Sequence, residues 1–158
     1  MIGAALGISA GWLVIVGKLP PAGACAAAAG ALLLLGTHRA NHGAGGPVDR
    51  MLGELLDRAW DGAVFGTIAW VERIDEPHVA AGALVALCAS FLSSYVRARG
   101  AALLYSVEES HVTRGVRYAL VSYGLLSEAL GWTVWAAAGV SVLAALVRTS
   151  QVAQEDRA

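Results

Sequence analysis

Long apolar runs alternate with short polar segments along this chain of 158 residues. Six such runs are evident, at about 2–17, 22–37, 51–71, 79–99, 113–131 and 132–147. Each approaches the ~20 residues that a helix needs to cross a bilayer, although the first, second and last are short. The pattern predicts an all-α, polytopic membrane protein. We expect one domain over 1–147, a bundle of six transmembrane helices, followed by a cytoplasmic tail at 148–158.

Composition supports a membrane protein. Hydrophobic residues make up 57% of the chain and charged residues only 15%, with a mean hydropathy of +0.61. These values lie well outside the range of soluble domains. The two cysteines, Cys25 and Cys88, fall within apolar runs and read as small packing residues, so no disulfide framework is predicted. We expect membrane lipid and no nucleic acid as a partner.

The basic residues predict the orientation in the membrane. With six spans, nine of the 11 Lys and Arg residues fall on the side that holds both termini, and two fall on the other side. The nine are Arg39, Arg50, Arg58, Arg97, Arg99, Arg114, Arg117, Arg148 and Arg157, and the two are Lys18 and Arg73. Because basic loops stay in the cytoplasm, this distribution predicts a multi-pass protein of the inner (cytoplasmic) membrane with both termini cytoplasmic.

An acidic stripe opens the third apolar run. Glu54, Asp57 and Asp61 follow an i, i+3, i+7 spacing, which places them on one face of a helix. Carboxylates near lipid are costly unless a cation or a basic pocket compensates them. By the predicted topology, this stripe faces the cytoplasm.

Four arginines are predicted at the same level of the membrane. Arg97 and Arg99 end the fourth run, and Arg114 and Arg117 begin the fifth. Anchoring of the helices by long basic side chains accounts for one or two of them. Four around one loop, opposite an acidic stripe, favour the binding of a phosphate group.

Two histidines at the end of the second run leave two interpretations open. His38 and His42 lie four residues apart, a spacing that suits Zn²⁺ or Mn²⁺ ligands on a helix. They are also consistent with surface-facing polar residues at a helix end, and that interpretation is the more common one.

The motifs together resemble the CDP-alcohol phosphotransferases. The family signature is D-x-x-D-G-x-x-A-R, eight residues, then G-x-x-x-D-x-x-x-D, and its second half matches Gly53, Asp57 and Asp61. The stretch 94–99, Ser-Tyr-Val-Arg-Ala-Arg, and the pair Arg114-x-x-Arg117 are also similar to the family. The first half of the signature does not match: its aspartates fall on Gly36 and Arg39, and no acidic residue precedes Asp49.

The resemblance implies a site in a cytoplasm-facing cavity of a six-helix bundle. Family carboxylates hold a divalent metal, so Asp57 and Asp61 are implied as ligands of Mg²⁺ or Mn²⁺, with Asp61 as the general base. His38 and His42 are candidate substitutes for the missing aspartates. Arg97, Arg99, Arg114 and Arg117 are implied to bind the phosphate of the acceptor or the lipid, and Gly53 is the backbone position of the motif.

Two functions follow from the resemblance, and a third from the residues alone. The first is an enzyme of phospholipid biosynthesis that transfers a substituted phosphate between a CDP-linked donor and an alcohol. The second is a non-catalytic paralogue that keeps the fold and binds lipid or nucleotide, as a homodimer or paired with a homologue. The third, a small channel or transporter, is disfavoured because the charges gather at one face of the membrane.

Overall fold

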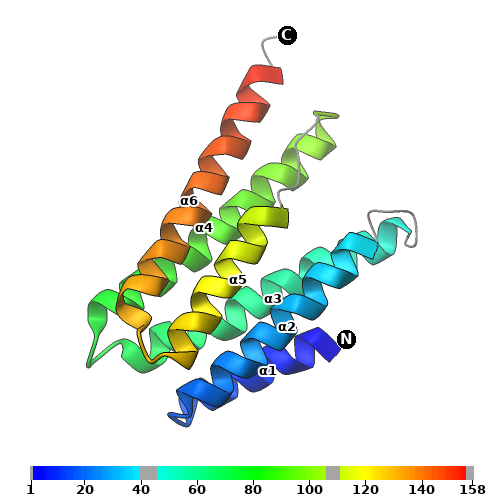
Figure 1. The fold of residues 1–158 in the computed structure, drawn as a ribbon. Coiled ribbons are helices and arrows are strands. Elements are labelled where there is room, and N and C mark those ends of the chain that lie inside the picture. The colour runs from blue at the N-terminus through cyan, green and yellow to red at the C-terminus, as the bar shows by residue number, and fades with distance from the viewer. Residues whose placement is uncertain (1, 40–45, 106–110, 156–158) are drawn as a thin grey trace.

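A computed structural model describes residues 2–39, 46–105 and 111–155, and within these ranges the regular structure is entirely helical (Figure 1). The helices are α1 (Ile2–Ile15), α2 (Leu19–Arg39), α3 (Pro47–Glu72), α4 (Pro77–Ala102), α5 (His111–Leu126) and α6 (Leu130–Glu155). The predicted all-α, six-helix bundle is confirmed.

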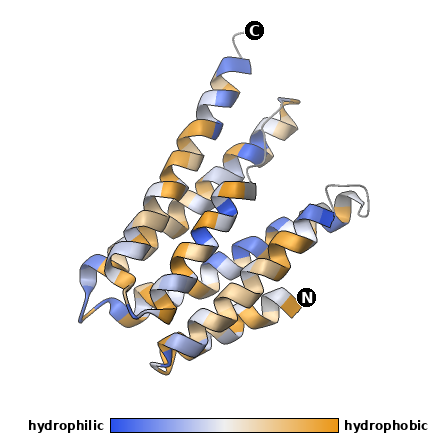
Figure 2. Cartoon of the chain, in the orientation of Figure 1, coloured by the Kyte–Doolittle hydropathy of each residue, from blue (hydrophilic) through white to orange (hydrophobic). Residues whose placement is uncertain are grey.

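The helices differ in how apolar they are. In the described residues, α2, α4 and α6 are long and apolar enough to cross a membrane, and α1 contributes a shorter apolar stretch at Ala5–Ile15. Figure 2 shows hydrophilic positions near the helix ends and on α5, with apolar positions along α1, α2 and α6. The polar positions of α3 and α5 include the candidate site residues. The chain is a polytopic membrane protein, and its less apolar helices carry several of the candidate site residues.

The helices pack side by side as a ring. Neighbours follow the order α1, α2, α5, α6, α4, α3 and back to α1, and α2 also touches α3. Helices α3 and α5 face each other across this ring. No Cα atom of the described part of α3 lies within 8 Å of one in α5. Side chains therefore fill the space between these two helices.

Small residues let α2 approach its neighbours closely. Ala22, Ala26 and Ala29 are fully buried along one side of the helix. A Cβ atom on Gly23 would lie 2.7 Å from the backbone nitrogen of Leu126 in α5. Contacts of this kind are typical of helices that associate in a membrane.

The start of α3 is set by local chemistry. Pro47 occupies the first turn, where its missing N–H costs no hydrogen bond. The side chain of Asp49 accepts a hydrogen bond of 2.8 Å from the backbone N–H of Gly46. A carboxylate in this position also complements the helix dipole. This defined start fixes the register of the acidic stripe that follows.

Two helix ends lie furthest from the predicted ones. Helix α5 ends at Leu126 and not at 131, because Glu128 adopts a left-handed conformation (φ 55°) and turns the chain. Helix α6 continues to Glu155, whereas the prediction ended the span at 147 and began a tail at 148. An apolar run marks the part of a helix that suits lipid, and the helix itself continues through polar residues.

Candidate functional site

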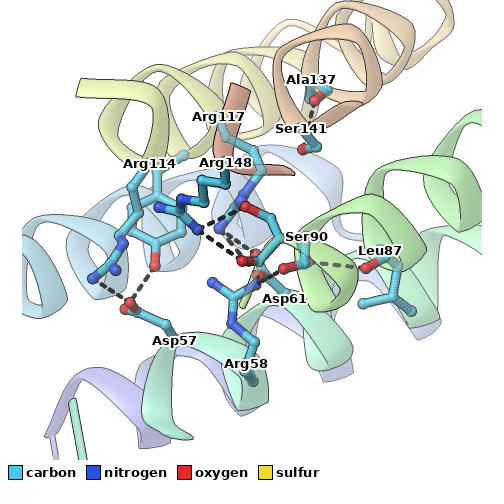
Figure 3. Close-up of polar contacts among 12 residues, drawn as sticks. Asp57, Arg58, Asp61, Leu87, Ser90, Arg114, Arg117, Ala137, Ser141 and Arg148 are labelled. Atoms are coloured by element: carbon cyan, nitrogen blue, oxygen red, sulfur yellow. Dashed lines mark hydrogen bonds and ion pairs between the residues drawn. The ribbon is translucent and has the colours of Figure 1, made fainter. Parts of the chain in front are cut away.

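Two buried carboxylates form the centre of the candidate site. Asp57 and Asp61 lie one turn apart on α3 and point into the ring of helices (Figure 3). Both residues are completely inaccessible to solvent, at 0% exposure. Unpaired carboxylates in such an environment are costly, so their partners determine what the site can do.

Asp57 is held by two side chains of α5. The hydroxyl of Tyr118 donates a hydrogen bond of 2.8 Å to Oδ1 of Asp57. The guanidinium group of Arg114 forms an ion pair with Oδ2 of the same carboxylate. Both oxygens of Asp57 therefore face a donor.

Asp61 is held by two arginines. Nη1 of Arg58 lies 2.9 Å from its Oδ2, and Nη2 of Arg117 lies 3.0 Å from each of its two oxygens. Arg58 also donates a hydrogen bond of 2.7 Å to the backbone oxygen of Ser90 on α4. Side chains of α3 and α5 and the backbone of α4 thus meet around Asp61, and each of its two oxygens contacts a guanidinium group.

The ring of Tyr118 packs between α2 and α3. Its ring centroid lies 4.3 Å from that of Trp60. On the other side, a Cβ atom on Gly30 would come within 2.9 Å of the tyrosine ring. The ring is therefore fixed on both sides, which holds its hydroxyl toward Asp57.

The arginines also line a small recess that is partly open to solvent. Its wall combines four arginines with hydroxyl groups and small apolar side chains of α4, α5 and α6. The lining residues are Arg58, Ser90, Ser93, Thr113, Arg114, Arg117, Val140, Ser141, Ala144 and Arg148. Nη1 of Arg148 lies 2.6 Å from Oγ of Ser93. Guanidinium and hydroxyl groups are the donors that bind phosphate oxygens.

Only two of the four arginines that were predicted to bind phosphate lie at the site. Arg114 and Arg117 contact the aspartates and line the recess. Arg97 does not line it and forms an ion pair with Glu54, the third member of the acidic stripe. Arg99 is exposed near the end of α4. The described fourth helix therefore does not supply the arginines of this recess.

Sequence reasoning did not assign a role to Arg58, Arg148 or Tyr118. Arg58 lies between the two aspartates in the chain, and Tyr118 follows Arg117 directly. From these positions, a helical projection could have identified Arg58 and Tyr118 as candidate site residues. Arg148 falls just after the last apolar run, in the segment predicted as a tail. Its role depends on the continuation of α6, which hydropathy does not reveal.

The remaining predicted residues that the structure describes, Gly53 and His38, lie near the end of α2. Gly53 permits a close approach, since a Cβ atom there would lie 3.3 Å from Cγ2 of Thr37. His38 is exposed, and His42 lies outside the described residues. Gly36 and Arg39, at the positions of the signature's missing aspartates, are both exposed.

The side chains at the site do not suit a divalent cation, because their carboxylate oxygens are already paired. All four oxygens of Asp57 and Asp61 face a tyrosine hydroxyl or a guanidinium group. A cation there would lie beside three arginines, whereas Mg²⁺ and Mn²⁺ favour sets of free oxygen ligands. Across the ranges that the structure covers, no group of three or more His, Cys, Asp or Glu side chains is placed to hold a metal ion.

Comparison with known proteins gives a related sequence. The chain is 34% identical over 122 residues to a phosphatidylinositol phosphate synthase of Corynebacterium glutamicum. The match covers 72% of this chain and 56% of the synthase, so it spans just over half of that relative's length. No family model matches the chain.

Solved structures show the same fold. A phosphatidylinositol phosphate synthase of Mycobacterium tuberculosis with CDP-DAG bound superposes with a TM-score of 0.79 at 24% identity, over 95% of this chain and 82% of that one. The same enzyme in complex with manganese and citrate gives a TM-score of 0.75 at 23% identity, over 95% of this chain and 78% of that one. The related sequence and the shared fold confirm the resemblance to the CDP-alcohol phosphotransferase family that the motifs carry.

Proposed function

We propose that the protein takes part in phospholipid biosynthesis and binds the phosphate groups of its substrates in the arginine-lined recess. The observation that carries this proposal is the meeting of Arg58, Arg114, Arg117 and Arg148 at one recess beside two buried aspartates. Arginine at buried sites recognises phosphate by paired hydrogen bonds and keeps its charge. The related synthases, one of them solved with CDP-DAG, support a CDP-linked lipid as the donor.

The first candidate activity is transfer of a substituted phosphate to an alcohol. The acceptor oxygen attacks the phosphorus that carries the lipid, a P–O bond forms, and the bond to CMP breaks. Asp61, which faces the recess through Arg58 and Arg117, takes the proton of the acceptor hydroxyl. The guanidinium groups stabilise the negative charge that spreads over the transferred phosphate.

The second candidate is a non-catalytic member of the family that binds the same ligands without turnover. The ion pairs at the site favour it, because both oxygens of Asp61 are already engaged by arginines. A base must release such partners before it takes a proton. In this role the protein pairs with an active homologue or with a second copy of itself at the cytoplasmic membrane.

An assay with radiolabelled CDP-diacylglycerol separates the two candidates. Purified protein is incubated with alcohols and phosphorylated alcohols, with and without Mg²⁺ or Mn²⁺. Turnover that is lost in Asp61→Asn and kept in Asp75→Asn, an exposed carboxylate in the α3–α4 connection, supports transfer. Binding of the donor without turnover, together with co-purification of a homologue, supports the second candidate. Failure to bind any such ligand contradicts both.

A further inference from the structure

The negative charges at the site are offset by arginines and need no metal ion. Asp57 and Asp61 contribute two negative charges, and the three arginines in contact with them contribute three positive charges. Arg114 and Arg117 are each only 7% exposed, so water screens this cluster weakly. A divalent cation added to a cluster that is already net positive is repelled by the guanidinium groups.

The same arginines retain unused donors. In the part of the chain that the structure describes, Nε of Arg58 and Nε of Arg117 are buried and make no hydrogen bond. Buried donors of this kind are costly when they stay unsatisfied, and a ligand with several acceptor oxygens satisfies them. Both arginines line the recess, next to the hydroxyl groups of Ser90 and Ser93.

We propose that Arg58, Arg114 and Arg117 take the place of a divalent cation at Asp57 and Asp61, so that the recess binds a phosphate group without metal. This inference rests on the proposed function, since it assumes that the ligand carries phosphate. Both aspartates then position arginines, whether or not Asp61 also acts as the base. Each one fixes the guanidinium groups around it in the wall of the recess.

Helix α2 is consistent with this replacement. The family signature places carboxylates at the positions of Gly36 and Arg39, and here neither side chain can coordinate a cation. No acidic residue occurs anywhere in the first 48 positions of the chain. Acidic groups are missing from α2, and Asp57 and Asp61 on α3 are both paired with arginine. Each of these two differences favours the binding of an anion over the binding of a cation.

The test uses the full-length protein in detergent, Mn²⁺ as the metal probe and inorganic phosphate as the ligand probe. Electron paramagnetic resonance measures Mn²⁺ binding, and calorimetry measures phosphate binding in EDTA and in Mn²⁺. We expect no Mn²⁺ site that depends on Asp57, and phosphate affinities in the two buffers that agree within about twofold. Arg117→Gln should weaken phosphate binding at least about tenfold, because it removes charge-assisted hydrogen bonds.

The test includes a control variant and results that would contradict the inference. Arg73→Gln removes an exposed arginine that contacts Trp70 at the opposite end of α3, and it should leave phosphate affinity unchanged. One Mn²⁺ per chain that disappears in Asp57→Asn would overturn the inference. So would phosphate binding that requires Mn²⁺, although the proposed phosphate site would then stand. Phosphate binding in neither buffer overturns the proposed function as well.

Discussion

Asp57 and Asp61 are buried inside a membrane protein, where each depends on its partners for stability. The partners of Asp57 come from α5, which does not approach α3 at the level of the backbone. Long side chains therefore carry the connection across the ring of helices. This arrangement makes single side chains at the site important for the stability of the fold.

Tyr118→Phe tests one of these connections. The substitution removes the hydroxyl that donates to Asp57 and leaves a buried carboxylate oxygen without that bond. We expect a loss of about 1–3 kcal/mol in the free energy of unfolding, measured by denaturation in detergent. Tyr123→Phe is the control, because Tyr123 is exposed on the same helix. Equal stability of the two variants would contradict the assigned role of Tyr118.

Arg114→Gln tests the ion pair with Asp57. Removing one partner of a buried pair leaves an uncompensated charge and costs about 3–5 kcal/mol. The double variant Asp57→Asn/Arg114→Gln should recover part of this loss, because it removes the stranded charge. Unfolding measurements on the two single variants and the double variant give the coupling free energy. Strictly additive effects would show that the two groups do not interact.

At the scale of helices, glycines set how closely neighbours pack. Gly23→Ala places a Cβ atom 2.7 Å from the backbone of α5, where no flexible side chain can yield. We expect it to destabilise the bundle by about 1–3 kcal/mol through overpacking. Gly139→Ala in α6 is the matched control, since a Cβ there meets no atom within 4 Å. The control should be neutral or stabilising by up to about 1 kcal/mol, and similar thermal shifts for both variants would contradict the packing.

The number and type of the helices could be predicted from the sequence, because apolar runs separated by turns carry a strong signal. Their ends could not, since Glu128 turns the chain within an apolar segment and α6 continues through polar residues. Asp57, Asp61, Arg114 and Arg117 were also predictable as a group. Spacing along one helix identifies a shared face, but it does not reveal which side chain of another helix reaches that face. The sequence therefore did not distinguish Arg97, which pairs with Glu54, from the arginines of the recess.

At the scale of the whole molecule, the ring of helices gathers polar groups from α3, α4, α5 and α6 around one recess. The C-terminal ends of α2, α4 and α6 lie at the same end of the bundle as the N-terminal end of α3 (Figure 1). The basic residues of the chain concentrate near these helix ends. We propose that this end faces the cytoplasm, where soluble phosphorylated compounds are available to the recess.

A reporter fusion after residue 158 tests this orientation. We expect activity from a reporter that folds in the cytoplasm, and none from one that requires export, because basic segments remain inside. The same reporters fused after residue 74, in the connection between α3 and α4, should give the opposite result. A C-terminal fusion that is active only after export would contradict the topology.

The central claim is that the arginine-lined recess beside Asp57 and Asp61 binds a phosphate group without a divalent cation. An experimental density map of the protein with CDP-diacylglycerol, prepared in EDTA, tests it most directly. We predict phosphate density within hydrogen-bonding distance of Arg58 and Arg117, with both aspartates still paired to arginine. If the ligand appears there only when Mn²⁺ is added, with ion density between Asp57 and Asp61, the account is wrong.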